Sequence, residues 1–243
     1  MADANTSRPS RVALVTGAAG GLGRALVEEL LAQGWQVGAG WHQKPISQPH
    51  PALLPVPLDV TSAPSVQAAV QQLLDRWHRL DLLIHNAGLT RDSLIAQMQP
   101  ADWEAVLAVN LKGAFLCARA ALPVMQQQRS GHIIHISSHA ARAGTRGQAN
   151  YAAAKAALLG LTLSLAREAA PYDVRVNAVL PGVLPTEMTR RLRPEQINAL
   201  AEANLLRRLN DLAEVARFVV FLAGMKNVSG QIFQLDSRLN SWT

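Results

Sequence analysis

The chain has 243 residues, of which 49% are hydrophobic and 16% charged, so it has enough apolar side chains for a buried core and is not a disordered protein. The net charge of +6 is not gathered into a basic run with interleaved aromatic residues, and we therefore expect no nucleic-acid partner. A single cysteine, Cys117, excludes an internal disulfide and is expected to be a buried, inert thiol.

Residues 1–10 are expected to form a flexible tail and residues 11–243 a single domain, because no break in composition divides the chain. The tail lacks the apolar segment of a signal peptide, and no apolar run is expected to reach the roughly 18 residues that span a bilayer. We therefore expect a soluble, cytoplasmic protein without a membrane segment.

In the order of the chain, the first predicted elements are a strand over residues 11–15 and a helix over residues 22–33, which Gly34 ends. The glycine-rich turn between them offers bare backbone N–H groups and the positive end of the helix to a pyrophosphate. The sequence therefore predicts a dinucleotide site, to which four residues of the turn would contribute: Gly17, Gly21, Leu22 and Gly23.

The end of the second predicted strand, residues 36–41, indicates which dinucleotide binds. A site that prefers NAD usually has an acidic residue here for the ribose hydroxyls, whereas this chain has Trp41 and no acidic residue in positions 30–58. His42 and Lys44 could instead contact a 2'-phosphate, which favours NADP, with NAD as the second choice. The alternative is that both are solvated loop residues.

Residues 45–57 contain five prolines, so we expect an extended loop in place of a crossover helix, with residues 58–60 ending the third strand. Asp59, with Val60, is placed to reach an adenine, or else Asp59 caps the helix predicted over residues 63–80.

A fourth strand, residues 81–84, ends in His85 and the small, polar run Asn86, Ala87 and Gly88. This run suits a cofactor ribose that passes close to the backbone, although Asn86 could equally brace the neighbouring strands.

A long apolar helix is predicted from Asp102, as its N-cap, to residue 127. It contains Asn110, whose buried carboxamide needs hydrogen-bond partners to offset its lost hydration. Asn110 could kink the helix, or its carbonyl could hold a water near Lys155.

The buried strand predicted over residues 133–136 leads to Ser138 at its carboxyl end, where open α/β sheets bind ligands. Asn150 is expected to cap a helix in which Tyr151 and Lys155 lie one turn apart on one face. An ammonium group there lowers the pKa of the phenol and makes Tyr151 a candidate general acid or base. Taken alone, the Tyr-x-x-x-Lys spacing is often an accident of helix composition.

We expect no metal site. The histidines His132, His135 and His139 have ligand-like intervals, but residues three apart on a strand point to opposite faces.

The last third of the chain predicts a strand over residues 174–180, a helix over residues 212–223 that begins with the capping box of Asp211 and Glu214, and a strand over residues 228–236. Together the elements predict an α/β fold, a Rossmann-like doubly wound parallel sheet of about seven strands with helices on both faces.

Over nearly its whole length the chain resembles the short-chain dehydrogenase/reductase family. The matching motifs are Thr16-Gly-x-x-x-Gly-x-Gly23, Asn86-Ala-Gly88, Asn110, Ser138, Tyr151-x-x-x-Lys155, Pro181-Gly182 and Thr186. Within the family it is most similar to the 3-oxoacyl-(acyl carrier protein) reductases, through residues 88–92, 147–151 and 164–168.

The resemblance implies a single dinucleotide-binding catalytic domain that reduces a carbonyl with a nicotinamide cofactor, as in fatty acid biosynthesis. It implies that Tyr151 gives the proton and that Ser138 binds the same oxygen. Lys155 would lower the pKa of the tyrosine and hold the cofactor ribose, while Asn110 would hold a water. The nicotinamide carboxamide would lie against Pro181, Gly182, Val183 and Thr186.

The resemblance also implies a homotetramer and a substrate lid over about residues 187–209. The arginines of the lid, which could meet an acidic acyl carrier protein or simply be solvated, are Arg190, Arg191, Arg193, Arg207 and Arg208. The rival interpretations are a secondary-alcohol or other ketone dehydrogenase of the same family and a catalytically idle cofactor-binding subunit.

The chain departs from the family pattern at three places. His85 stands where Asn or Ser is common, and Gly20 stands where NADP-dependent members often have Arg, which weakens the preference for NADP. Ser237 and Arg238 replace two glycines near the C-terminus, which could alter subunit packing or the floor of the substrate site.

Overall fold

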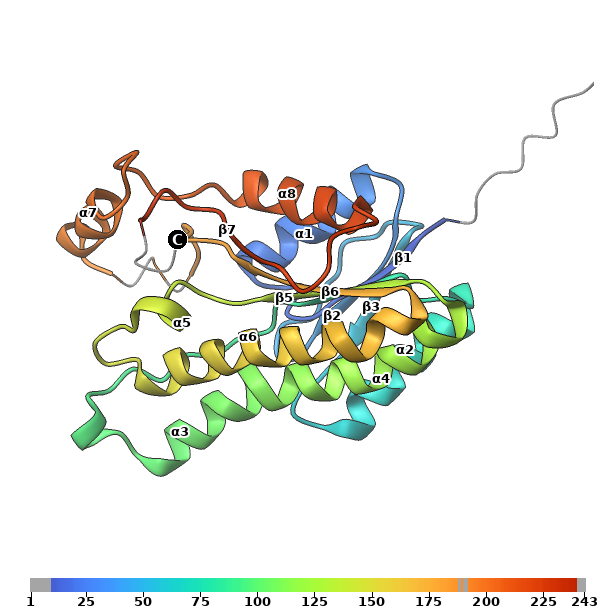
Figure 1. Cartoon of the computed structure of the whole chain (residues 1–243), viewed down its shortest axis with the longest axis horizontal. Coiled ribbons are helices and arrows are strands. Elements are labelled where there is room, and N and C mark those ends of the chain that lie inside the picture. Colours follow the sequence, from blue (N-terminus) through green and yellow to red (C-terminus); the bar gives the residue numbers. More distant parts are fainter. Residues whose placement is uncertain (1–9, 188, 190–191, 240–243) are drawn as a thin grey trace, which may run out of the picture.

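One parallel sheet organises the computed structural model, which describes residues 10–187, 189 and 192–239. Within these residues the strand order is β3-β2-β1-β4-β5-β6-β7 (Figure 1). The strands are β1 (Val12–Val15), β2 (Gln36–Trp41), β3 (Leu53–Pro57), β4 (Leu82–His85), β5 (Gly131–Ile136), β6 (Val174–Leu180) and β7 (Ile232–Gln234). Residues 1–9 of the predicted tail, and Arg190 and Arg191 of the predicted lid, lie outside the described residues.

Helices cover both faces of the sheet, so the predicted doubly wound α/β fold is confirmed. Helices α1 and α8 lie on one face and α2, α4 and α6 on the other (Figure 1). The helices are α1 (Gly21–Ala32), α2 (Ala63–Trp77), α3 (Pro100–Leu107), α4 (Gly113–Gln128), α5 (Ala140–Ala143), α6 (Ala149–Ala169), α7 (Pro194–Glu202) and α8 (Leu212–Gly224).

The central strands are buried on both faces, as a parallel sheet between two helix layers requires. Every residue of β1, β4 and β5 is buried, which explains why these strands read as continuous apolar runs in the sequence. The strand order reverses between β1 and β4, and a crevice opens at the carboxyl ends of the strands at such a reversal. The predicted site residues at the ends of β1, β4 and β5 lie at this edge.

The third strand lies earlier in the chain than predicted. No helix separates β2 from β3, as expected from the prolines, but β3 spans Leu53–Pro57 and residues 58–60 follow it. Pro55 and Pro57 are accommodated because β3 is the edge strand, where a missing backbone N–H leaves no ladder bond unmade.

Three helix boundaries differ from their predictions. The long helix begins at Pro100 with Gln99 as N-cap, so Asp102 lies in the first turn, and a π-helical turn at Ala108–Lys112 interrupts it. Helix α6 begins at Ala149, so Asn150 is not its cap; the carboxamide donates 3.0 Å to the carbonyl of Arg91 instead. Helix α2 ends at Trp77 because His78 adopts a left-handed conformation (φ 59°).

One long helical run has the length and composition of a membrane span. Among the described residues, the run Pro100–Gln128 is long and apolar enough to cross a bilayer. Nearly half of its apolar window is buried, and its inner face packs against β5 and α6, as expected for a core helix.

Candidate active site

The carboxyl ends of β1 and β4 are joined by hydrogen bonds around Thr16. Its hydroxyl accepts from the backbone N–H groups of Asn86 (3.1 Å) and Ala87 (3.0 Å). The carboxamide of Asn86 donates 3.1 Å to the carbonyl of Thr16 and 3.2 Å to that of Gly17. Asn86 therefore braces the two strand ends, as its alternative interpretation proposed, and Thr16 is a structural residue whose role the sequence did not reveal.

The glycine turn has no room for side chains. A Cβ atom on Gly23 would lie 2.1 Å from the carbonyl oxygen of Gly17, and one on Gly17 would lie 2.9 Å from the Cα of Ala87. Gly17 also has a positive φ of 64°, which favours glycine. Helix α1 follows without a side-chain cap, so its first N–H groups are available to an anion. This bare cradle fits the pyrophosphate of a dinucleotide.

Tyr151 at the start of α6 and Ser138 after the end of β5 lie close enough for the Ser138 side chain to affect the pKa of the phenol. Burial raises the pKa of Tyr151; the hydrogen bond with Ser138 lowers it, and the charge of Asp92 raises it again. The net pKa lies above that of a free tyrosine, so the expected lowering by Lys155 is wrong for the protein without ligands.

Lys155 is buried on the same face of α6. Its ammonium group donates 2.8 Å to the backbone carbonyl of Ile136 and lies 5.7 Å from the ring centroid of Tyr151. Burial lowers the pKa of Lys155 to about 8. The ammonium therefore lies close enough to stabilise negative charge that develops on the phenol.

Asn110 lies in the π-helical turn and is completely buried. Its carboxamide donates to the carbonyls of Leu89 (2.8 Å) and Val106 (2.9 Å), which supplies the partners that its burial requires. The Oδ1 atom has no partner within the described part of the chain. A Cβ on Gly88 would lie 3.0 Å from this oxygen and 3.7 Å from Lys155 Nζ, so Asn110 and Lys155 border the same small space.

Known proteins of one family are similar in sequence to this chain. A sequence model described as short chain dehydrogenase matches residues 11–197. The chain belongs to this family. A 3-oxoacyl-[acyl-carrier-protein] reductase of Synechocystis is 37% identical over 95% of this chain and 97% of the relative, and one of Thermotoga maritima is 38% identical over 94% and 97%. The Escherichia coli reductase of the same name is 37% identical over 88% and 89%.

In this short-chain dehydrogenase, the loop after β6 reaches the glycine turn. Thr186 Cγ2 would lie 3.0 Å from a Cβ on Gly21. The loop is held by Asn210, whose side chain donates 2.8 Å to the carbonyl of Pro181 and whose backbone N–H donates 3.0 Å to that of Val183. A Cβ on Gly182 would meet Asp236 at 2.8 Å. The predicted nicotinamide-side residues thus lie beside the predicted phosphate turn.

The residues predicted to select NADP are exposed and each has an acidic neighbour. Lys44 Nζ lies 3.2 Å from Glu187, and His42 Nε2 lies 4.0 Å from Asp59. The pairing of Lys44 with Glu187 joins the end of β2 to the start of the predicted lid, a contact that sequence spacing gives no means of finding.

Asp59 and Val60 have structural contacts of their own. Asp59 accepts from the N–H (2.9 Å) and hydroxyl (2.7 Å) of Thr61, while Ser62 is the N-cap of α2, so the alternative of Asp59 as the helix cap is wrong. The side chain of Val60 is buried, with Cγ2 2.9 Å from the position of a Cβ on Gly113. A contact of Val60 with an adenine would therefore involve its backbone.

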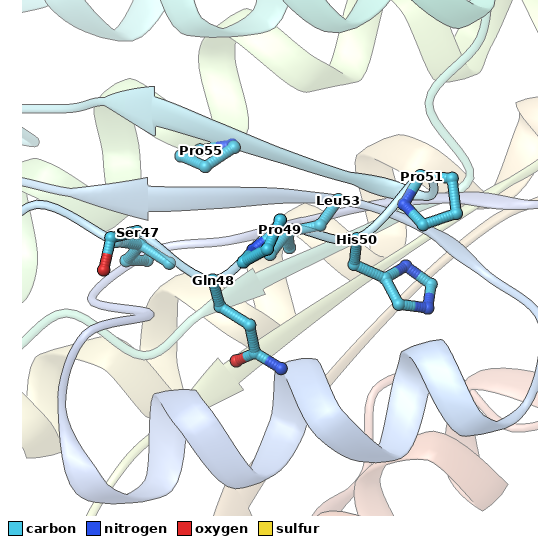
Figure 2. Close-up of a pocket in the computed structure, with 8 residues that line it drawn as sticks. Ser47, Gln48, Pro49, His50, Pro51, Leu53 and Pro55 are labelled. Atoms are coloured by element: carbon cyan, nitrogen blue, oxygen red, sulfur yellow. The ribbon is translucent and has the colours of Figure 1, made fainter.

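A hollow of about 530 Å³ lies along the proline-rich segment, next to the edge strand (Figure 2). It is lined by residues 46–51, Leu53 and Pro55, and Figure 2 shows Gln48 and His50 projecting over the neighbouring helix. None of the candidate catalytic residues lines it. We assign the site to the sheet edge and not to this hollow.

Proposed function

We propose that this short-chain dehydrogenase reduces the keto group of a 3-oxoacyl thioester carried by an acyl carrier protein, with NADPH as the preferred cofactor. The observation that supports it best is the grouping of Ser138, Tyr151 and buried Lys155, with the lysine ammonium 5.7 Å from the tyrosine ring centroid. The names of the relatives support the substrate class.

The cofactor, when bound, supplies the hydride. Its proposed binding residues are Gly17, Gly21, Leu22, Gly23, His42, Lys44, Asp59, Val60, Asn86, Ala87, Gly88, Tyr151, Lys155, Pro181, Gly182, Val183 and Thr186. The bare glycine turn and the uncapped start of α1 fit its phosphates.

Tyr151 donates a proton to the substrate oxygen and Ser138 donates a hydrogen bond to the same atom. The raised pKa of Tyr151 suits the reducing direction because it keeps the proton on the phenol until the oxygen becomes basic. Lys155, with a pKa of about 8, is mostly charged at pH 7 and then stabilises the phenolate. Asn110 Oδ1 is available to a water that links Lys155 to solvent.

Basic residues on the lid provide a surface for an acidic carrier protein. Arg193, Arg207 and Arg208 are exposed, in the segment that leads into and out of α7. Opposite charges across such a surface speed association more than they strengthen final binding.

We expect kcat/KM for acetoacetyl carrier protein to exceed that for acetoacetyl coenzyme A by at least about tenfold at low salt, because the carrier is acidic. Arg208→Glu should remove most of this advantage without changing turnover of the coenzyme A thioester. Lys226→Glu, an exposed charge at the other end of the sheet, is the matched control. Steady-state kinetics with both thioesters, on the unmodified protein and the two variants, measure these differences.

Two outcomes would overturn the substrate assignment. Faster turnover of simple ketones or secondary alcohols would favour another dehydrogenase of the same family. Tight NADPH binding with no turnover of any carbonyl compound would favour an idle cofactor-binding subunit.

The preference for NADPH rests on Lys44 and His42, and a 2'-phosphate would compete with Glu187 for Lys44. We expect Glu187→Gln to tighten NADPH binding by about two- to fivefold, the range set by an exposed ion pair, and to leave NADH binding unchanged. Lys44→Ala should weaken NADPH binding by about five- to tenfold. Fluorescence titration of the unmodified protein, the two single variants and the double variant measures the coupling between Lys44 and Glu187 in NADPH binding.

Glu29→Gln, which removes a partly exposed carboxylate near the far end of α1, should change neither affinity and serves as the control. Tighter binding of NADH than NADPH by the unmodified protein would contradict the assignment of His42 and Lys44.

A cytoplasmic homotetramer completes the proposal. Helices α4 and α6 pack side by side and expose apolar side chains to solvent, among them Phe115 (45% exposed) and Leu163 (44%). A subunit contact over this face would cover them.

A further inference from the structure

Two histidines lie next to each other at the carboxyl ends of β4 and β5. His85 and His135 are paired in the register of the sheet, both are completely buried, and their rings meet edge to face with centroids 6.3 Å apart. Neither belongs to the proposed catalytic or cofactor-binding set. Two polar rings in the core beside the catalytic residues call for a physical explanation.

The hydrogen bonds of Thr16 determine the tautomer of His85. The Thr16 hydroxyl accepts from two backbone N–H groups, those of Asn86 and Ala87, which use both of its lone pairs. Its proton is therefore free for His85 Nδ1, 3.4 Å away. Because Nδ1 accepts, the neutral ring of His85 carries its proton on Nε2.

The hydrogen bonds of Thr162 give His135 the opposite tautomer. The Thr162 hydroxyl donates its single proton to the carbonyl of Leu158 (2.8 Å). It can then only accept from His135 Nδ1, which lies 2.9 Å away. His135 therefore carries its proton on Nδ1 and has a lone pair on Nε2.

The two Nε2 atoms are complementary. One is a donor and the other an acceptor, and both are buried. The backbone carbonyl of Asn110 raises the pKa of His85, as expected for a carbonyl that faces a ring N–H.

We infer that His85 and His135 form a neutral imidazole pair of opposite tautomers and that His135 positions Lys155. The link to Lys155 is direct in the chain, because Ile136, whose carbonyl accepts from the lysine ammonium, follows His135. His135, fixed to α6 through Thr162, holds this carbonyl in place. The role in positioning Lys155 rests on the proposed function; the tautomers do not.

The charges around the pair keep both rings neutral. Burial and the charge of Lys155 lower the pKa of His135 to about 3 and that of His85 well below its ordinary value. His135 also lowers the pKa of His85, and the backbone carbonyl of Asn110 raises it. A neutral pair adds no positive charge that would oppose the ammonium of Lys155.

Long-range proton–nitrogen correlation NMR on histidine-labelled full-length protein tests the pair without any substrate. We expect His85 with its proton on Nε2 and His135 with its proton on Nδ1, both unchanged from pH 8 to pH 5. Single variants at each position assign the signals. Equal tautomers, or titration of either ring above pH 5, would overturn the inference.

The positioning role is tested separately by the pH profile of kcat. His135→Asn places an amide N–H near the position of Nδ1 and should keep the profile of the unmodified protein, whereas His135→Leu should shift its alkaline limb. An unshifted profile for a folded His135→Leu variant would refute the role for Lys155. No reduction of a 3-oxoacyl thioester by the unmodified protein, with the expected tautomers present, would refute the proposed function alone. If His135→Leu does not fold, Thr162→Val, which removes the partner of His135 Nδ1, takes its place with the same expected shift.

Discussion

Replacing Tyr151 by Phe is expected to lower kcat/KM for keto-group reduction by about 10³-fold, within the range of 10² to 10⁴ for loss of a positioned general acid. The variant keeps the ring and removes only the hydroxyl whose pKa Ser138 affects. NADPH affinity and the thermal midpoint should change little, because the ring still packs beside Lys155.

Tyr172→Phe is the matched control, since it makes the same chemical change in an exposed 3₁₀ turn after α6. It should retain full activity. Steady-state kinetics and cofactor titration on both variants separate the loss of the acid from a loss of binding. Activity of Tyr151→Phe within threefold of the unmodified protein would remove Tyr151 from the mechanism.

Ser138→Ala in the Tyr151→Phe background should lower the rate further by less than about tenfold. Both side chains act on one substrate oxygen, and residues that act as a unit are not additive. Independent roles would instead give the product of the two single losses.

The strands that could be predicted from the sequence are those that are buried on both faces, because such strands form continuous apolar runs. β1, β4 and β5 are buried on both faces and therefore read as apolar runs. β3 could not be placed, because two prolines in an edge strand have the same local pattern as a loop, and only the neighbouring β2 shows that the segment is paired.

In the candidate site, too, some features could be predicted from local sequence and others depend on tertiary packing. The spacing of the motifs was enough to predict that Ser138, Tyr151 and Lys155 lie at one edge of the sheet. This was possible because helix and strand periodicity are local properties of the sequence. The sign of the Tyr151 pKa shift could not be obtained that way, because it depends on how deeply packing buries the phenol. The same holds for Asn150, which tertiary contacts with the Arg91 segment draw into the helix.

Replacing Gly23 by Ala is expected to weaken the affinity for both NADPH and NADH by at least about tenfold. Overpacking should also lower the free energy of unfolding by about 1–3 kcal/mol. The new Cβ would lie 2.1 Å from the carbonyl oxygen of Gly17 and 2.9 Å from both Ala18 Cα and Asn86 Nδ2. Two of these atoms belong to the backbone of the turn, so the clash is relieved only if the turn moves away from helix α1.

Gly224→Ala distinguishes this clash from a general effect of the substitution, because Gly224 is in helix α8 and a Cβ there meets nothing within 4 Å. That variant should be as stable as the unmodified protein or up to about 1 kcal/mol more stable, as expected for Ala in place of Gly in a helix. Thermal unfolding and fluorescence titration with both cofactors measure the difference. Because the same turn would bind the pyrophosphate and is braced by Asn86, Gly23→Ala should impair binding and stability together. Unchanged affinity in the destabilised variant would place the cofactor away from the glycine turn.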